Sequence, residues 1–118
     1  MTKHLVEQFL TSPLQSLPKN LDQFCNPELK FSSPLAKTQG LIEFAMFLLD
    51  IRWKFTELQL KKIFVDGDDV CAVYTKTSMN PDVGELLFTD LFKIQNGKIL
   101  SIESIFNAKP LLDSSAEI

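Results

Sequence analysis

The sequence has few of the residue types on which specialised sites depend. Among its 118 residues, the only cysteines are Cys25 and Cys71, the only histidine is His4 and the only arginine is Arg52. The two cysteines lie too far apart in sequence for a CxxC redox motif or a zinc site. No run of basic residues provides the clustered cations that binding to a phosphate backbone requires. We therefore expect no metal, no cofactor and no nucleic-acid partner.

Long hydrophobic runs are also absent. The most apolar stretch, residues 41–51, is interrupted by Glu43 and Asp50 and is too short to cross a bilayer. The first ten residues, MTKHLVEQFL, lack the apolar core and the cleavage site of a secretory signal. We expect a cytoplasmic protein that does not interact with membranes, in which both cysteines are reduced.

The chain is instead rich in phenylalanine. Hydrophobic residues make up 45% of the sequence, and ten phenylalanines accompany one tryptophan and one tyrosine. This content is sufficient for one domain, residues 1–118, to bury a core without disulfides or metals. Because a phenylalanine ring has no polar group, so many of them indicate a large apolar interior or an apolar cavity. The net charge of −3 mainly favours solubility.

The order of the expected elements defines the fold class. Apolar spacing predicts helices over residues 2–11, 19–25 and 38–54, with a short extended piece over 29–33. From Phe55 onward the pattern alternates with period two and predicts four strands linked by turns, one of them at Asn96-Gly97. The tail LLDSSAEI, residues 111–118, is expected to be loose. Helices followed by a meander predict an α+β fold, with N-terminal helices packed on one face of an antiparallel sheet. A strongly curved sheet around the long helix would leave a conical interior, which is a pocket.

One carboxylate lies on the most apolar strand face. Alternation puts Leu86, Phe88, Asp90, Phe92 and Ile94 on the same side of a strand. In one interpretation, Asp90 faces an apolar pocket, where desolvation raises its pKa and the protonated acid donates to a ligand oxygen. In the other, Asp90 is structural and accepts hydrogen bonds from a hydroxyl or an amide, or points outward at a bulge. A buried carboxylate needs a partner or must be neutral.

Other polar residues carry weaker signals. Ser33 precedes a proline, which is common loop chemistry, and could also line the mouth of the pocket. His4 lies near a chain end and is expected to be solvated. Tyr74 alternates with apolar residues and with Lys76, so its face is ambiguous; if it faces inward, it could pair with Asp90. The acidic turn at residues 66–69 lacks the ligand spacing of a calcium loop and is expected to be a solvated hairpin turn.

Three strings resemble a known group of proteins. They are LDQFCNPELKFSSP at residues 21–34, TQGLIEF at 38–44 and FTDLFKIQNGKILSIESIF at 88–106. Their order resembles the nuclear-transport-factor-2-like (NTF2-like) superfamily, which includes SnoaL-like polyketide cyclases and ketosteroid isomerases, over nearly the whole chain. The resemblance implies a cone fold with an apolar pocket, and sheet-to-sheet homodimers.

The catalytic groups of ketosteroid isomerases are only partly retained. Those enzymes use a general-base aspartate before a proline, a tyrosine on the first helix and a protonated aspartate on a long strand. By resemblance these positions correspond to Ser33, to the neighbourhood of Phe9 and to Asp90. A serine cannot accept a proton from carbon without its own activating base, and phenylalanine has no donor. The resemblance therefore implies the fold and the pocket, and Asp90 is the one catalytic candidate it retains.

Three functions remain open at this point. The first is binding of a small apolar molecule in the cone, the second a cofactor-free isomerase, cyclase or hydrolase that uses Asp90, and the third an interaction module with a filled cone. The residues expected to form the ligand pocket are Phe9, Phe24, Phe31, Ser33, Phe44, Phe47, Trp53, Tyr74, Phe88, Asp90 and Phe92. The residues expected on the outer sheet face, where we expect a homodimer contact, are Ile63, Val65, Leu87, Thr89 and Leu91.

Overall fold

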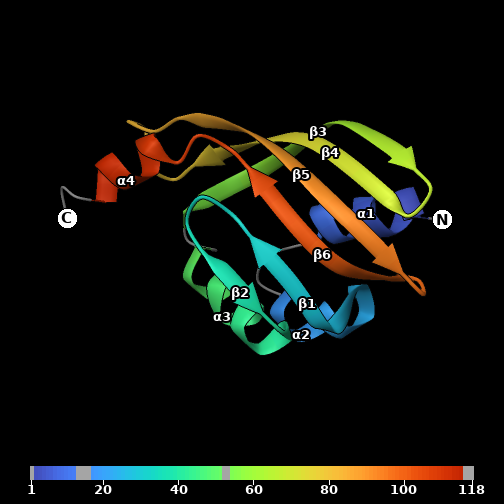
Figure 1. Ribbon diagram of the computed structural model, residues 1–118. Helices are drawn as coiled ribbons and strands as arrows, with labels where there is room; N and C mark the ends of the chain where they lie inside the picture. Colours follow the sequence, from blue (N-terminus) through green and yellow to red (C-terminus); the bar gives the residue numbers. More distant parts are fainter. Residues whose placement is uncertain (1, 13–16, 52–53, 116–118) are drawn as a thin grey trace.

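In the described part of the chain, two helices, two strands and a third helix come first, and four long strands and a short helix follow. The computed structural model describes residues 2–12, 17–51 and 54–115 (Figure 1). In chain order the elements are α1 (Thr2–Thr11), α2 (Leu17–Phe24), β1 (Cys25–Ser32), β2 (Lys37–Gln39), α3 (Leu41–Ile51), β3 (Phe55–Asp66), β4 (Asp69–Ser78), β5 (Glu85–Gln95), β6 (Lys98–Ile105) and α4 (Lys109–Ser115). The expected α+β class is confirmed.

The strands form a single sheet in the order β2-β1-β6-β5-β4-β3. The four long strands β3 to β6 make the expected antiparallel meander. At the turn between β5 and β6, Asn96 and Gly97 both have positive φ, 52° and 76°, as a tight two-residue hairpin turn requires. The sheet is open, since β2 and β3 end it on either side.

The short extended piece predicted over residues 29–33 is longer in the structure, and it pairs in a way that the sequence did not indicate. As β1, it begins at Cys25 and lies parallel to β6, with Phe31 opposite Ile102. The β1–β6 register shifts between Cys25 and Lys30. Pro27 lies within this interval and has no N–H to donate, so an interrupted ladder is expected here.

Register shifts bend the sheet around the helices. One lies in β3 between Leu60 and Lys62, and another lies in β6, where Leu100 is left unpaired between the partners of Lys93 and Ile94. An extra residue on one strand increases the local twist and bends that strand. The sheet curves over α1, α2 and α3, which lie on its concave side (Figure 1).

Apolar side chains attach the helices to this concave face. Val6 and Phe9 of α1 and Phe44 and Leu48 of α3 are buried in one core cluster with the inward residues of the strands. The third helix begins at Leu41, later than the predicted residue 38, because residues 37–39 form strand β2. Glu43 Oε1 then accepts a hydrogen bond from the Gln39 amide at 2.9 Å, which caps the new helix start.

The prediction of a loose tail is wrong for residues 111–115, which belong to helix α4 (Figure 1). Asn107 Oδ1 accepts from the Lys109 amide at 3.2 Å and caps the helix. Leu111 is 6% exposed and belongs to the core cluster. The buried Leu111 and the Asn107 cap both stabilise this short helix.

Two of the residues expected on the outer sheet face lie on the inner one. Ile63 is opposite Ala72 and Val65 is opposite Val70, and both of these β4 partners are buried. The register shift between Leu60 and Lys62 changes which residues of β3 face inward. Phe64 therefore takes the outward position.

Candidate ligand cavity

A cavity of about 410 Å³ lies between the helices and the concave face of the sheet. Its walls come from α1, β1, α3 and the inner faces of β3 to β6. Thr11 and Thr56 belong to its lining and are themselves exposed, so the cavity opens to solvent between α1 and the start of β3. A volume of this size is in the usual range for small-molecule sites, about 300–1,000 Å³. The cone is therefore not filled by its phenylalanines.

Most of the residues expected to form the pocket border this cavity. Those that line it are Phe9, Phe31, Ser33, Phe44, Phe47, Tyr74, Phe88 and Asp90. Phe24 and Phe92 do not line it; each packs edge-on against Phe9, with ring centroids 6.0 and 6.1 Å away, and so supports the wall from behind. Trp53 lies outside the described residues.

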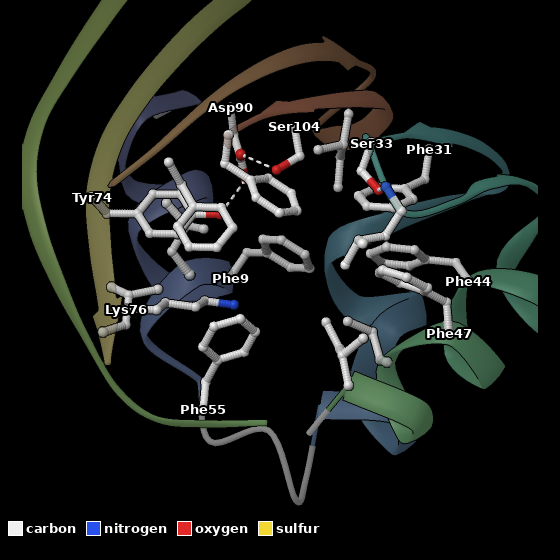
Figure 2. A pocket seen from close by; sticks show the side chains of 18 of the residues that line it. Phe9, Phe31, Ser33, Phe44, Phe47, Phe55, Tyr74, Lys76, Asp90 and Ser104 are labelled. Atoms are coloured by element: carbon white, nitrogen blue, oxygen red, sulfur yellow. Dashed lines mark hydrogen bonds between the residues drawn. The ribbon is translucent and has the colours of Figure 1, made fainter. Parts of the chain in front are cut away.

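Asp90 reaches into the cavity and is held by two hydroxyls. It is 4% exposed. Tyr74 Oη donates to Oδ2 at 2.6 Å and Ser104 Oγ donates to Oδ1 at 2.7 Å, as Figure 2 shows. Strand register explains the contact: Ser104 is directly opposite Asp90, and Tyr74 lies diagonally across from it, beyond the small Ala72. Tyr74 thus faces inward and stacks on Phe88 at 5.2 Å between centroids.

Burial controls the protonation of this cluster. Burial raises the pKa of Asp90, while the hydrogen bonds from Tyr74 and Ser104 and the charge of Lys76 act in the opposite direction to a smaller extent. Burial and the neighbouring carboxylate also raise the pKa of Tyr74 well above its ordinary value. Tyr74 therefore remains a neutral hydrogen-bond donor in the physiological pH range.

Lys76 brings a cation into the same space. Its amine points into the cavity (Figure 2) and lies 5.2 Å from the ring centroid of Phe55, 5.6 Å from Phe88 and 5.8 Å from Tyr74. Such distances allow cation–π attraction, about 0.5–2 kcal/mol for each well-placed ring. Burial lowers the pKa of Lys76, and the charge of Asp90 opposes this shift.

Sequence reasoning did not single out Lys76 or Ser104 as site residues. The signal for Lys76 was its alternation with Tyr74, because two residues two positions apart on a strand share a face. A lysine side chain usually points to solvent, so its presence on that face left it open whether Tyr74 points inward or outward. Ser104 could have been found by pairing the strands around the Asn96-Gly97 turn, which brings it opposite Asp90.

The other singled-out polar residues do not join the cluster. The hydroxyl of Ser33 accepts from the Leu35 and Ala36 amides, both at 3.1 Å, so it stabilises its own loop at the cavity wall. His4 lies on α1 and is exposed. The acidic residues of the β3–β4 turn are exposed as well. Within the described residues, no group of three or more His, Cys, Asp and Glu side chains is arranged to hold a metal ion.

The chain is similar to solved structures of one fold. No protein-family model matches the sequence, and no curated protein matches it significantly. An NTF2-like protein of unknown function from Cytophaga hutchinsonii is 21% identical with a TM-score of 0.77, and the alignment covers 95% of each chain. An LEH-like epoxide hydrolase from M. tuberculosis is 18% identical with a TM-score of 0.76, over 98% of this chain and 92% of that one. A hypothetical protein with a ketosteroid isomerase-like fold from Catenulispora acidiphila, solved in complex with trimethylamine, is 12% identical with a TM-score of 0.80, over 98% and 95%.

Proposed function

Starting from the NTF2-like fold that the chain shares with these structures, we propose that the protein binds a small, mainly apolar molecule in its cavity. The observation that carries this proposal is the composition of the walls. Aromatic and aliphatic side chains line most of the cavity, and Tyr74, Lys76, Asp90 and Ser104 form a polar cluster on the sheet side. Apolar walls with a few placed polar groups are the usual design of a small-molecule site.

The cluster also indicates the polar group of the ligand. Tyr74 and Ser104 both direct their hydroxyl hydrogens at Asp90, so neither donor is directed at a ligand. Lys76 has no carboxylate within 4.0 Å among the described residues, and its amine is the donor that faces the cavity. A ligand with an acceptor oxygen, such as a ketone, an aldehyde or an alcohol, complements this donor. Since Lys76 and Asp90 balance in charge, a neutral ligand is favoured.

The binding proposal is tested with neutral ring compounds that carry one ketone or alcohol. We expect some of them to raise the melting temperature and to bind by calorimetry. We expect Lys76→Met to weaken their binding roughly tenfold to a hundredfold, because a hydrogen bond from a charged group contributes about 1.5–3 kcal/mol. Lys62→Met is the matched control, since Lys62 lies over the Phe64 ring at 5.1 Å but is exposed on β3.

Two results would count against the binding proposal. One is that no compound stabilises the protein and that native mass spectrometry of the purified protein finds no bound molecule. The other is that Lys62→Met weakens binding as much as Lys76→Met does. Either result would indicate that the cavity is not the binding site of these compounds.

A cofactor-free isomerase, cyclase or hydrolase is the second candidate. The hydrogen bond between Tyr74 and Asp90 inside the cavity favours it, because it joins a carboxyl of raised pKa to a neutral phenol. Asp90 would give or take the proton of the reaction. Incubating the bound compounds with the protein and following them by mass spectrometry and NMR tests this: conversion that is lost in Asp90→Asn supports an enzyme, and unchanged compounds leave a binder.

We also propose a homodimer through the outer sheet face and a cytoplasmic location. Large apolar side chains on that face are exposed in the single chain: Phe64, Leu87, Leu91 and Ile105.

The proposed cytoplasmic location is supported by the cysteines. Both are free, as a reducing compartment requires. None of the helices within residues 2–12, 17–51 and 54–115 has the length and apolarity to span a membrane. Cell fractionation would test the location.

A further inference from the structure

Lys76 differs from the other lysines in its surroundings. Among the lysine side chains that the structure describes, all are exposed except those of Lys76 and Lys98. The amine of Lys98 is occupied, since it donates to the backbone oxygens of Asp22 at 2.7 Å and of Gln23 at 3.1 Å. The amine of Lys76 contacts aromatic rings and faces an accessible cavity, and it has no hydrogen-bond acceptor or carboxylate within bonding distance in the described part of the chain. It is therefore the amine best placed to react with a bound molecule.

We propose that Lys76 forms a reversible covalent imine with an aldehyde or ketone held in the cavity. This inference rests on the proposed binding function and specifies the ligand as a carbonyl compound. Three features of the site support it. The rings of Phe55, Tyr74 and Phe88 surround the amine, the cavity admits a small molecule beside it, and the Asp90 carboxyl borders the same space.

The reaction balances without any oxidant or reductant. The lone pair of neutral Nζ attacks the carbonyl carbon, a C–N bond forms, and the electron pair of the C=O π bond moves to oxygen. Asp90 takes one proton from the nitrogen and passes it to that oxygen, which gives a carbinolamine. A second proton follows the same route, the C–O bond breaks, and the oxygen leaves as water while C=N forms. Both hydrogens of the amine end on the departing water, and Asp90 returns to its starting state.

The environment keeps the amine reactive. Burial lowers the pKa of Lys76, which raises the share of neutral amine at a given pH. The ionisable groups that face it are Asp90 on β5, whose charge acts against this shift, and Tyr74 on β4, which stays neutral. The described lining residues of α1, β1, α3, β3 and β6 are uncharged. The reaction at Lys76 should therefore begin at lower pH than reaction at the exposed lysines.

Reductive trapping tests the inference on the intact protein. The probe is 2-naphthaldehyde with sodium cyanoborohydride, which converts an imine into a stable secondary amine. We expect one adduct per chain, with the mass of the aldehyde less one oxygen atom, located on Lys76 by peptide mapping. We expect the adduct at that position to be lost in Lys76→Met and in Lys76→Arg, and to be retained in the matched control Lys62→Met. Since mapping of the wild-type protein locates the adduct, the test does not depend on any variant folding.

The alcohol 2-naphthalenemethanol separates the inference from the binding proposal, because it fits the same space and cannot form an imine. Protection of Lys76 from the aldehyde by the alcohol supports the inference. If the alcohol binds and stabilises the protein but Lys76 is labelled no more than the surface lysines, the imine is excluded and non-covalent binding stands. If neither compound binds, both the inference and the binding of this ligand class are contradicted.

Discussion

Asp90 carries its carboxyl group into an apolar interior, and its partners explain why the fold tolerates it there. An unpartnered polar or charged group in such a place would cost on the order of several kcal/mol. Tyr74 and Ser104 each supply a donor, and the half-buried Lys76 supplies an opposite charge in the same cavity. Both oxygens of the carboxylate thus have a hydrogen-bond donor, which offsets part of the cost of burial.

The raised pKa of Asp90 predicts a pH dependence of stability. Between its ordinary value of 3.8 and the raised value, the folded protein holds a proton that the unfolded chain has released. Stability must then fall as pH rises through this window. The side chain in Asp90→Asn does not titrate. We therefore expect the melting temperature of the variant, relative to that of the wild type, to increase as pH rises from acidic to neutral. Thermal melts of both proteins over a pH series check this.

The exposed Glu103 on β6 provides the control. Glu103→Gln should show a melting-temperature difference from the wild type that changes little over the same pH series. A difference between wild type and Asp90→Asn that stays flat, or that moves in favour of the wild type as pH rises, would show that folding does not raise the pKa of Asp90.

The site could be predicted from sequence only as far as its apolar part. Alternation along β5 placed Asp90 on one face with Phe88 and Phe92, and it left open whether that face lines a pocket. Lys76 could not be assigned, since a lysine on a strand is ordinarily taken to face solvent. Only the curvature of the sheet creates an interior with room for its amine, and curvature depends on register shifts that the sequence pattern does not reveal.

At the scale of elements, one lysine ties α2 to the start of β6. The ammonium of Lys98 donates to the backbone oxygens of Asp22 and Gln23, in the last turn of α2, where carbonyls lack partners within the helix. A cation at this end also interacts favourably with the helix dipole. We expect Lys98→Met to lower the free energy of unfolding by about 0.5–1.5 kcal/mol, a modest value because the contact is partly exposed to solvent.

Urea denaturation measures this difference, with Lys93→Met as the comparison, since Lys93 is exposed on the neighbouring strand β5. Amide exchange should also quicken in α2. Equal stabilities of the two variants would mean that the Lys98 contact does not hold the helix.

Local pattern accounts for the elements that were predicted, and long-range packing accounts for those that were not. Period two and tight turns were enough for β3 to β6, because each pairs with its neighbour in sequence. The extent of β1 was missed because its ladder partner, β6, is far along the chain and Pro27 resembles a turn signal. Helix α4 was missed because its order depends on the burial of Leu111 against other elements.

At the scale of the whole molecule, the outer sheet face is the surface most suited to a second copy. Leu87 is 60% exposed and Leu91 is 42% exposed, and Phe64 and Ile105 lie on the same face. Water contact with these side chains is unfavourable, and a matching sheet removes it. We expect the wild type to be a dimer, and we expect Leu91→Lys to convert it to a monomer. Size-exclusion chromatography with light scattering measures this.

Ile42→Lys is the matched control, since Ile42 is 80% exposed on α3, away from the sheet. This variant should remain dimeric. A monomeric wild type, or dissociation by Ile42→Lys with none by Leu91→Lys, would contradict the outer-face dimer.

The parallel pairing of β1 with β6 sets the order in which the cone can be completed during synthesis. Strands β4 and β5 can pair as soon as they leave the ribosome, since β4 meets β3 and β5 meets β4, which are already made. Strand β1 must wait for β6, the last strand of the sheet, before Phe31 can lie opposite Ile102. Until then the apolar side chains of the future cavity remain exposed to solvent. The nascent chain is therefore most prone to aggregate and to bind chaperones just before its final strand emerges. Loss of residues 98–105 would therefore do more than shorten the sheet: it would leave β1, β2 and the helices packed on them with no strand to join.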